Sequence, residues 1–152
     1  AMPSEAPLPE NAVIDRLVVY KSKRTMSAYS QGKLLKNYPI SLGKQPVGHK
    51  QFEGDGKTPE GKYRINERNP NSGYHKNLGI SYPNEADKAY AAAQGKSPGG
   101  LIKIHGMKNG WGFIGKKHLQ KDWTNGCIAV TDEEVDELYR SVKHNAEIEI
   151  LP

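Results

Sequence analysis

One cysteine and one histidine of this sequence stand where they could do chemistry together. Cys127 is the only cysteine among 152 residues, and it follows a glycine in the segment DWTNGCIAV. His105 ends the apolar run LIKIH and is followed at once by Gly106. A thiol attacks as its thiolate, and a nearby histidine can take its proton and form an ion pair with it. The pair therefore predicts nucleophilic catalysis by a thiolate whose pKa lies below about 8.5.

The other histidines are weaker candidates for the base. His49 and His118 lie in lysine-rich segments and are expected to be exposed, whereas His144 is expected in the last turn of a helix, where its charge suits the dipole. His75, in SGYHKN, could line a cleft. Structural interpretations stay open, because a lone cysteine is often a small buried hydrophobic residue. No CxxC, HxH or HExxH spacing occurs, so the sequence predicts neither a metal site nor a cofactor.

A mainly β scaffold is expected to position these residues. Alternating apolar and polar residues predict strands at 16–20, 25–29, 34–42, 61–66, 78–82, 101–105, 127–130 and 147–150. Residues 48–61 carry four glycines and a proline and are therefore expected to form a loop.

Two short helices are also expected. Residues 84–87 provide an N-cap for an alanine-rich helix that stops at Gly95. Residues 131–134 read as a capping box, and Val135, Leu138 and Val142 follow as one apolar stripe at helical spacing. These apolar positions are expected to serve the core alone.

Length and charge limit the function classes. A chain of 152 residues is most simply one domain, expected at 13–152, and residues 1–12 are expected to form a flexible linker left after removal of a signal peptide or anchor. No segment approaches the roughly 20 apolar residues that cross a bilayer. The net charge of +5 favours acidic partners without choosing among nucleic acid, anionic lipid and cell-wall polymer.

The chain resembles the catalytic domain of L,D-transpeptidases of the YkuD type, in the branch with a DWTxGCIAV segment. The family motif of a His-Gly followed by Ser/Thr-x-Gly-Cys matches His105-Gly106 and residues 124–127. The resemblance extends through LKNYPISLGKQPVGHK, GDGKTPEGKYRI and ISYPNEADKAYAAAQGKSPGGLIKIHG, which covers nearly everything after residue 15. The chain departs from the pattern at Ala129, where many members have arginine, and in a slightly longer loop before the cysteine.

The resemblance implies a mixed β-sandwich or barrel-like fold and a thioester mechanism. Cys127 would attack the carbonyl at the L-centre of meso-diaminopimelate in a peptidoglycan stem peptide and expel the terminal D-residue. His105 would relay protons, with its other ring nitrogen oriented by the Gly106 carbonyl. Backbone N–H groups of Gly126 and Cys127 would meet the oxyanion, and Thr124 would support the turn.

Other residues are expected to bind the substrate. Trp111 and Trp123 bracket the loop before the cysteine, which could form a lid. The candidate substrate-binding residues are Tyr74, His75, Tyr82, Asn84, Trp123, Thr124 and Asn125.

The resemblance thus implies a monomeric periplasmic enzyme of a Gram-negative bacterium. Its partners would be peptidoglycan stem peptides and, in one variant of the hypothesis, a wall-anchored lipoprotein. Two alternatives stay open: a hydrolytic member acting as a carboxypeptidase or lipoprotein-releasing amidase, and a non-catalytic wall-binding module. Nucleic acid is not expected as a partner, because no strand interleaves aromatic and basic residues.

Overall fold

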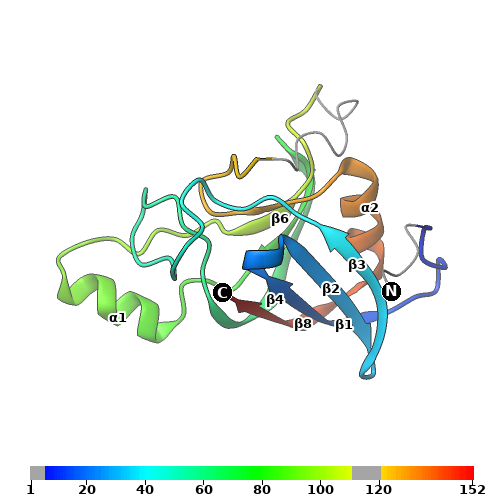
Figure 1. The fold of residues 1–152 in the computed structure, drawn as a ribbon, viewed down its shortest axis with the longest axis horizontal. Coiled ribbons are helices and arrows are strands. Elements are labelled where there is room, and N and C mark those ends of the chain that lie inside the picture. Colours follow the sequence, from blue (N-terminus) through cyan, green and yellow to red (C-terminus); the bar gives the residue numbers. More distant parts are fainter. Residues whose placement is uncertain (1–5, 111–120) are drawn as a thin grey trace.

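Eight strands form one sheet in the computed structural model, which describes residues 6–110 and 121–152. The order across the sheet is β3-β2-β1-β8-β4-β5-β6-β7, and the sheet curls into a half-barrel (Figure 1). The strands are β1 (Ile14–Tyr20), β2 (Thr25–Ser30), β3 (Lys33–Pro39), β4 (Gly61–Ser72), β5 (His75–Ile80), β6 (Lys103–His105), β7 (Ile128–Ala129) and β8 (Val142–Leu151).

The sheet is mixed, as the expected fold class required. The pairs β1–β8 and β6–β7 run parallel, and the other neighbours run antiparallel. The last strand, β8, lies in the middle of the sheet and joins the β1–β3 part to the β4–β7 part. The mainly β, barrel-like prediction is confirmed.

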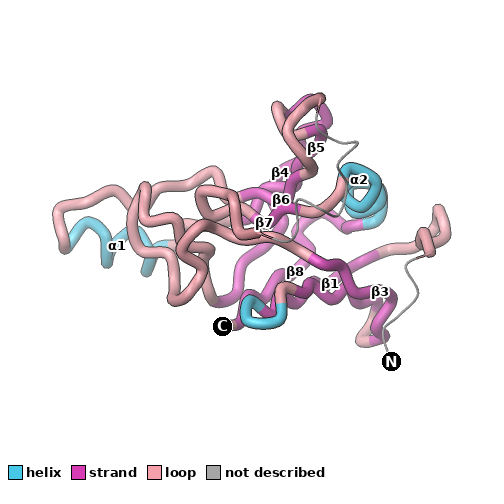
Figure 2. The backbone as a smooth tube through the Cα atoms, turned by 45° about the horizontal axis from the view of Figure 1, so that its top comes forward, coloured by secondary structure: helices cyan, strands magenta, loops and turns pink. Residues whose placement is uncertain are grey.

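Both predicted helices are present, and local capping explains where they start. The helix α1 (Glu85–Ala93) begins after Asn84, whose side chain accepts a hydrogen bond of 2.9 Å from the Asp87 N–H. The helix α2 (Asp132–Ser141) begins after Thr131 with the same reciprocal arrangement. Figures 1 and 2 show the two helices at opposite ends of the molecule. A short 3-10 turn, η1 (Lys21–Lys23), joins β1 to β2.

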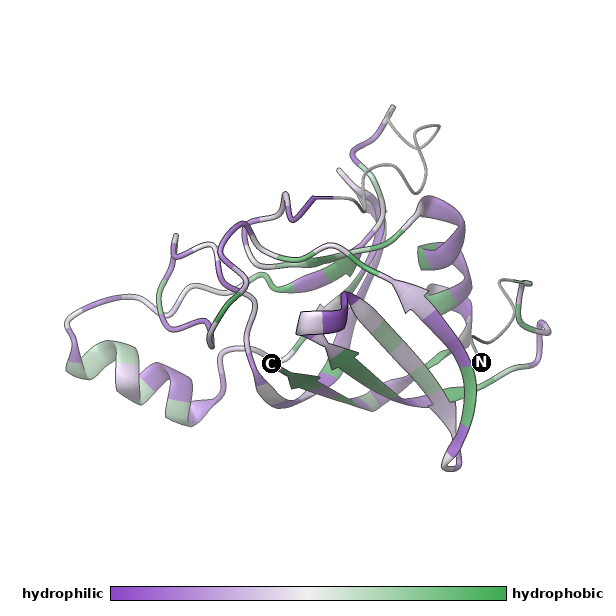
Figure 3. Cartoon of the chain, viewed as in Figure 1, coloured by the Kyte–Doolittle hydropathy of each residue, from purple (hydrophilic) through white to green (hydrophobic). Residues whose placement is uncertain are grey.

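The core lies between the curled sheet and α2. Apolar residues concentrate on the strands in Figure 3, and α2 contributes Val135 and Leu138, both fully buried. Burying one such side chain stabilises the fold by about 1.5–3 kcal/mol. Ile104 of β6 and Ile128 of β7 are fully buried partners in the same ladder. The strands that carry the candidate site are therefore anchored in the core.

The structure corrects the predicted end of the second helix. Val142 was expected on its apolar stripe and His144 in its last turn, but both residues lie in β8. The helix ends at Ser141 because β8 gains hydrogen-bonded neighbours on both sides, a non-local benefit that outweighs helical spacing.

Several strand boundaries also differ from the sequence pattern. β3 ends at Pro39, β4 extends to Ser72, and β5 covers residues 75–80 instead of 78–82. β6 starts only at Lys103, because Leu101 takes a left-handed conformation with φ of 56° and is 82% exposed.

His49 is not the free surface residue that its lysine-rich context suggested. Its Nδ1 accepts a hydrogen bond of 2.8 Å from the Glu60 N–H, and its Nε2 lies 2.9 Å from Asp87 Oδ1. The ring therefore ties the loop before β4 to α1. His118 lies outside the described residues.

The start of the described chain docks on α2. The Leu8 N–H donates a hydrogen bond of 2.8 Å to Glu137 Oε2, and the Leu8 side chain packs against the core. Leu8, within the segment expected to be a flexible linker, thus contacts the domain. In the part of the chain that the structure describes, no helix has the length and apolar content needed to span a bilayer.

Candidate active site

Two neighbouring parallel strands bring His105 and Cys127 to one cavity. His105 ends β6, Cys127 immediately precedes β7, and Ile104 pairs with Ile128 across the two strands. The cavity has a volume of about 450 Å³. It is lined by Lys44, Ser72, Tyr74, Asn77, Leu101, Lys103, His105, Trp123, Thr124, Asn125 and Cys127.

The His105 ring is held in one orientation. Its Nδ1 lies 2.7 Å from the Gly106 carbonyl oxygen, so Nδ1–H donates and Nε2 carries the free lone pair of the neutral ring. The rings of Tyr74 and Trp123 lie with centroids 4.7 Å and 5.6 Å from the imidazole. Burial lowers the pKa of His105, although the hydrogen bond to Gly106 acts in the opposite direction.

The Cys127 thiol forms hydrogen bonds with the main chain at the start of β6 and just before it. Its Sγ lies 3.4 Å from the Leu101 carbonyl oxygen, to which it donates, and 3.4 Å from the Lys103 N–H, from which it accepts. Burial raises the pKa of Cys127, and the Lys103 N–H and the charges of Lys103 and Lys50 offset this only in part.

The expected thiolate–imidazolium pair with a depressed cysteine pKa is therefore wrong for the resting site. Burial raises the pKa of the Cys127 thiol and lowers the pKa of His105, and both shifts favour neutral groups. A neutral thiol beside a neutral imidazole can still react when proton removal accompanies attack.

Thr124 closes the turn that presents the nucleophile. Its Oγ1 donates a hydrogen bond of 2.7 Å to the Cys127 carbonyl and accepts one of 3.1 Å from the Gly126 N–H. The support expected from Thr124 is thus present. The Gly126 N–H, however, is already occupied, so of the two proposed oxyanion donors the N–H of Cys127 remains.

Both site glycines are fixed by close packing. Gly126 has φ of 129°, and a Cβ there would lie 2.7 Å from the Lys57 carbonyl oxygen. A Cβ on Gly106 would lie 2.5 Å from Asp132 Oδ1, the atom that accepts a hydrogen bond of 2.8 Å from the Met107 N–H. Gly106 thus lets the chain after His105 lie against the start of α2.

A segment after β3 holds the nucleophile turn from the side. The Lys44 N–H donates to the Thr124 carbonyl at 3.0 Å, and the Thr124 N–H donates to the Leu42 carbonyl at 3.2 Å. Asp122, at the start of the turn, accepts a hydrogen bond of 3.1 Å from the Leu42 N–H and forms an ion pair of 2.7 Å with Arg24. The turn is therefore tied to the residue before β2 and to the segment after β3.

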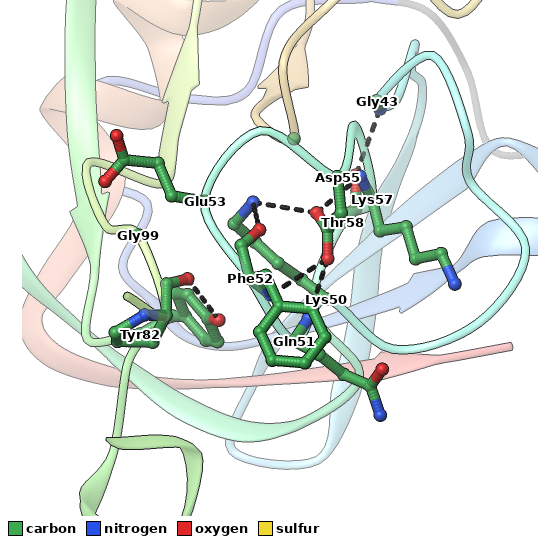
Figure 4. Close-up of polar contacts among 12 residues, drawn as sticks. Gly43, Lys50, Gln51, Phe52, Glu53, Asp55, Lys57, Thr58, Tyr82 and Gly99 are labelled. Atoms are coloured by element: carbon green, nitrogen blue, oxygen red, sulfur yellow. Dashed lines mark hydrogen bonds and ion pairs between the residues drawn. The ribbon is translucent and has the colours of Figure 1, made fainter. Parts of the chain in front are cut away.

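The glycine-rich loop between β3 and β4 packs against this turn through Lys57 and Gly126, and Asp55 organises the loop (Figure 4). Asp55 accepts hydrogen bonds from the main chain of Gln51, Phe52 and Lys57 and pairs with the buried Lys50 at 2.9 Å. Thr58 Oγ1, in the same loop, accepts a hydrogen bond of 3.0 Å from the N–H of Gly43 (Figure 4). Burial raises the pKa of Asp55, but these bonds outweigh it and leave the pKa lowered.

Four of the predicted substrate-binding residues do line the cavity with His105 and Cys127: Tyr74, Trp123, Thr124 and Asn125. Trp111 lies outside the described residues, so the lid hypothesis stays a prediction.

Three other candidates lie elsewhere. His75 Nε2 bonds to Asp136 at 2.8 Å, and Asn84 caps α1. Tyr82 is 4% exposed, and its hydroxyl donates a hydrogen bond of 2.7 Å to the Pro98 carbonyl. Tyr82 borders a second, neighbouring cavity.

Sequence reasoning missed five lining residues: Lys44, Ser72, Asn77, Leu101 and Lys103. One of them, Lys103, carried a usable signal in the sequence. Lys103 lies two positions before His105 on the same strand, so their side chains share a face. Asn77 pairs directly with His105 across β5 and β6, which only the strand register reveals. In the described ranges, no cluster of three His, Cys, Asp or Glu side chains is placed to hold a metal ion.

Comparison with known proteins decides the family. A model of the YkuD L,D-transpeptidase catalytic domain matches residues 14–150. The chain belongs to this family. It is 32% identical over 131 residues to YafK of Escherichia coli (strain K12), whose name marks its L,D-transpeptidase activity as unproven. That alignment covers 82% of this chain and 45% of YafK, so the chain spans about half the length of this relative.

Solved structures share the fold of this family. The helical cell shape determining protein Pgp2 from Campylobacter jejuni superposes with a TM-score of 0.66 at 26% identity, over 92% of this chain and 48% of Pgp2. L,D-transpeptidase 1 of Mycobacterium tuberculosis superposes with a TM-score of 0.55 at 15% identity, over 90% of this chain and 60% of that one. The second likeness concerns the fold alone.

Proposed function

We propose that this domain is a cysteine-dependent peptidoglycan L,D-transpeptidase that acts on stem peptides through a thioester at Cys127. The observation that carries the proposal is the cavity shared by Cys127 and His105, in which the hydrogen bond of His105 Nδ1 to Gly106 leaves the lone pair on Nε2 to act as the base. Membership of the family supplies the substrate class.

The first half-reaction forms the acyl-enzyme. His105 Nε2 takes the thiol proton as Cys127 Sγ attacks the carbonyl carbon at the L-centre of the donor residue. The oxyanion accepts a hydrogen bond from the Cys127 N–H. As the intermediate collapses, the bond to the D-residue nitrogen breaks, His105 returns the proton to that nitrogen, and the D-residue leaves.

The second half-reaction releases the acyl group. An amine or a water molecule attacks the thioester and gives its proton to His105. Sγ then leaves and recovers a proton, which restores the neutral pair. An amine yields a crosslink or attachment of a protein, and water yields a trimmed or released product.

Hydrolysis is the second candidate outcome. Ala129, which stands where many members carry arginine, is fully buried and exchanges hydrogen bonds of 3.0 Å and 2.9 Å with Ser41. The position therefore offers the cavity no cationic side chain for an acceptor. This supports a hydrolytic option, including release of a wall-anchored lipoprotein.

The substrate and the charge favour a periplasmic location in a Gram-negative bacterium. The net charge of +5 would help the domain stay on an anionic wall. Cell fractionation of the full-length protein tests the location, and recovery in the cytosol would contradict it.

Incubation with purified muropeptides, with and without an amine acceptor, tests the activity. Mass analysis should show loss of the terminal D-residue in both cases, and a new amide only if the enzyme transfers. Unchanged muropeptides in both reactions would leave the wall-binding module as the better account.

A further inference from the structure

A lysine–glutamate pair crosses the sheet beside the nucleophile. Lys103 Nζ in β6 lies 2.8 Å from Glu67 Oε2 in β4, although β5 runs between these strands. Glu67, Gly79 and Lys103 occupy one row, because Gly79 pairs with Glu67 on one side and with Lys103 on the other. The register shift between Ile65 and Glu67 sets the position of the carboxylate in this row.

Gly79 makes the pair possible. A Cβ at this position would lie 2.8 Å from Glu67 Cβ and 3.1 Å from Lys103 Nζ. Glycine in a strand interior weakens the strand, so its presence in β5 indicates that close approach of neighbouring groups matters there.

The pair also lies between two cavities. Lys103 and Leu101 line both the Cys127 cavity and a second one of about 230 Å³. Glu67, Tyr82 and Lys88 border the second cavity alone. A group attached to Cys127 can therefore extend past Lys103 toward Glu67.

We propose that Lys103 and Glu67 recognise the zwitterionic end of the acyl donor's side chain, with Lys103 binding its carboxylate and Glu67 its ammonium. This inference rests on the proposed function, in which the donor residue is a diaminopimelate. Its side chain ends in an amine and a carboxylate on the same carbon, and neither takes part in the reaction. An adjacent ammonium and carboxylate on the protein complement this head group.

The reach of Lys103 itself supports the assignment. Its N–H contacts Cys127 Sγ at 3.4 Å, and its ammonium contacts Glu67. The lysine side chain thus runs from the thiol to the carboxylate. Diaminopimelate is a lysine with a carboxylate on its last carbon. Its side chain is therefore as long as that of Lys103, and in an acyl group on Sγ that lies alongside Lys103 it can extend as far as Glu67.

Three matched donor peptides test this inference. They carry diaminopimelate, lysine or norleucine at the third position, which removes first the carboxylate and then also the amine. The measurement is kcat/KM for release of the terminal D-residue. The wild-type protein should favour diaminopimelate over norleucine by about tenfold or more, since each charged hydrogen bond contributes on that order.

Two variants assign the charges. Lys103→Met should abolish the preference for diaminopimelate over lysine, and Glu67→Gln should abolish the preference for lysine over norleucine. Ratios between donors cancel the effect of Lys103 on the thiol. Glu85→Gln on α1, where the side chain of Glu85 is 94% exposed, should keep the wild-type ratios.

A carbapenem distinguishes failure of the Lys103–Glu67 subsite from failure of the proposed function, because its adduct reports acylation of the thiol without a zwitterionic side chain. Wild-type ratios in both variants would overturn the subsite even if the adduct forms. A wild-type protein that forms no adduct and releases no D-residue from any donor would overturn the proposed function itself.

Discussion

The main chain of Gly126 lies so close to the Lys57 carbonyl that a Cβ on Gly126 would approach its oxygen to 2.7 Å. Gly126 precedes the nucleophile, and Lys57 belongs to the loop that Asp55 organises. The position of Cys127 is therefore set by a segment some seventy residues earlier in the chain.

Gly126→Ala should destabilise the fold and misplace Cys127. The new methyl meets Lys57, and a φ of 129° is unfavourable for alanine. We expect a loss of about 2 kcal/mol or more in unfolding free energy, measured by urea denaturation, together with slower acylation by a carbapenem. Gly73→Ala is the matched control, because a Cβ there meets nothing within 4 Å. Equal effects of both substitutions would contradict the packing argument.

Alkylation of Cys127 by iodoacetamide should be slow at neutral pH. Burial raises the pKa of the folded thiol, so the rate should reach half of its maximum at a pH above about 8.5, the value for an ordinary thiol. The same protein in urea provides the control, since its unfolded cysteine should titrate with the ordinary pKa. A rate that reaches its plateau below pH 7 would instead establish a resting thiolate.

The raised pKa of Cys127 also makes the stability of the fold depend on pH. A thiol whose pKa is raised by folding stabilises the folded state while it is protonated, and this contribution is lost as pH rises above the pKa of the unfolded cysteine. Unfolding free energy of the wild-type protein should therefore fall more steeply between about pH 8 and 10 than that of Cys127→Ala.

Asp55→Asn should weaken the supporting loop. Asp55 neutralises Lys50, whose side chain is 3% exposed, and losing one partner of a buried pair typically costs about 3–5 kcal/mol. Because the pKa of Asp55 is lowered by folding, its contribution is present above about pH 4 and is lost as pH falls further. Urea denaturation should therefore show a smaller difference in unfolding free energy between variant and wild type at pH 3 than at pH 7. Glu53→Gln, in the same loop, should show little difference at either pH.

Local features of the fold could be predicted from the sequence. Capping at Asn84 and Thr131 uses residues within one turn, so both helix starts were confirmed. The contact of His105 with the carbonyl of the adjacent Gly106 is also present, and it was expected from the family resemblance. Features that depend on neighbouring residues alone need no knowledge of the sheet.

Non-local features could not be predicted in this way. Val142 joined β8 because that strand pairs with β1 and β4, which lie far away in sequence. The pair of Lys103 and Glu67 depends on the register of three strands. The raised pKa of Cys127 results from burial by segments that the sequence does not show to be close.

Mass spectrometry of the intact protein mixed with a diaminopimelate-containing tetrapeptide tests whether Cys127 forms the acyl-enzyme. We expect an adduct heavier by the acyl tripeptide, mapped by proteolysis to Cys127, with release of the terminal D-residue. The adduct should be lost in Cys127→Ala and should form at least about a hundredfold more slowly in His105→Gln, which removes the base. Release of the D-residue by folded Cys127→Ala at the wild-type rate would contradict the claim that this thiol is the nucleophile.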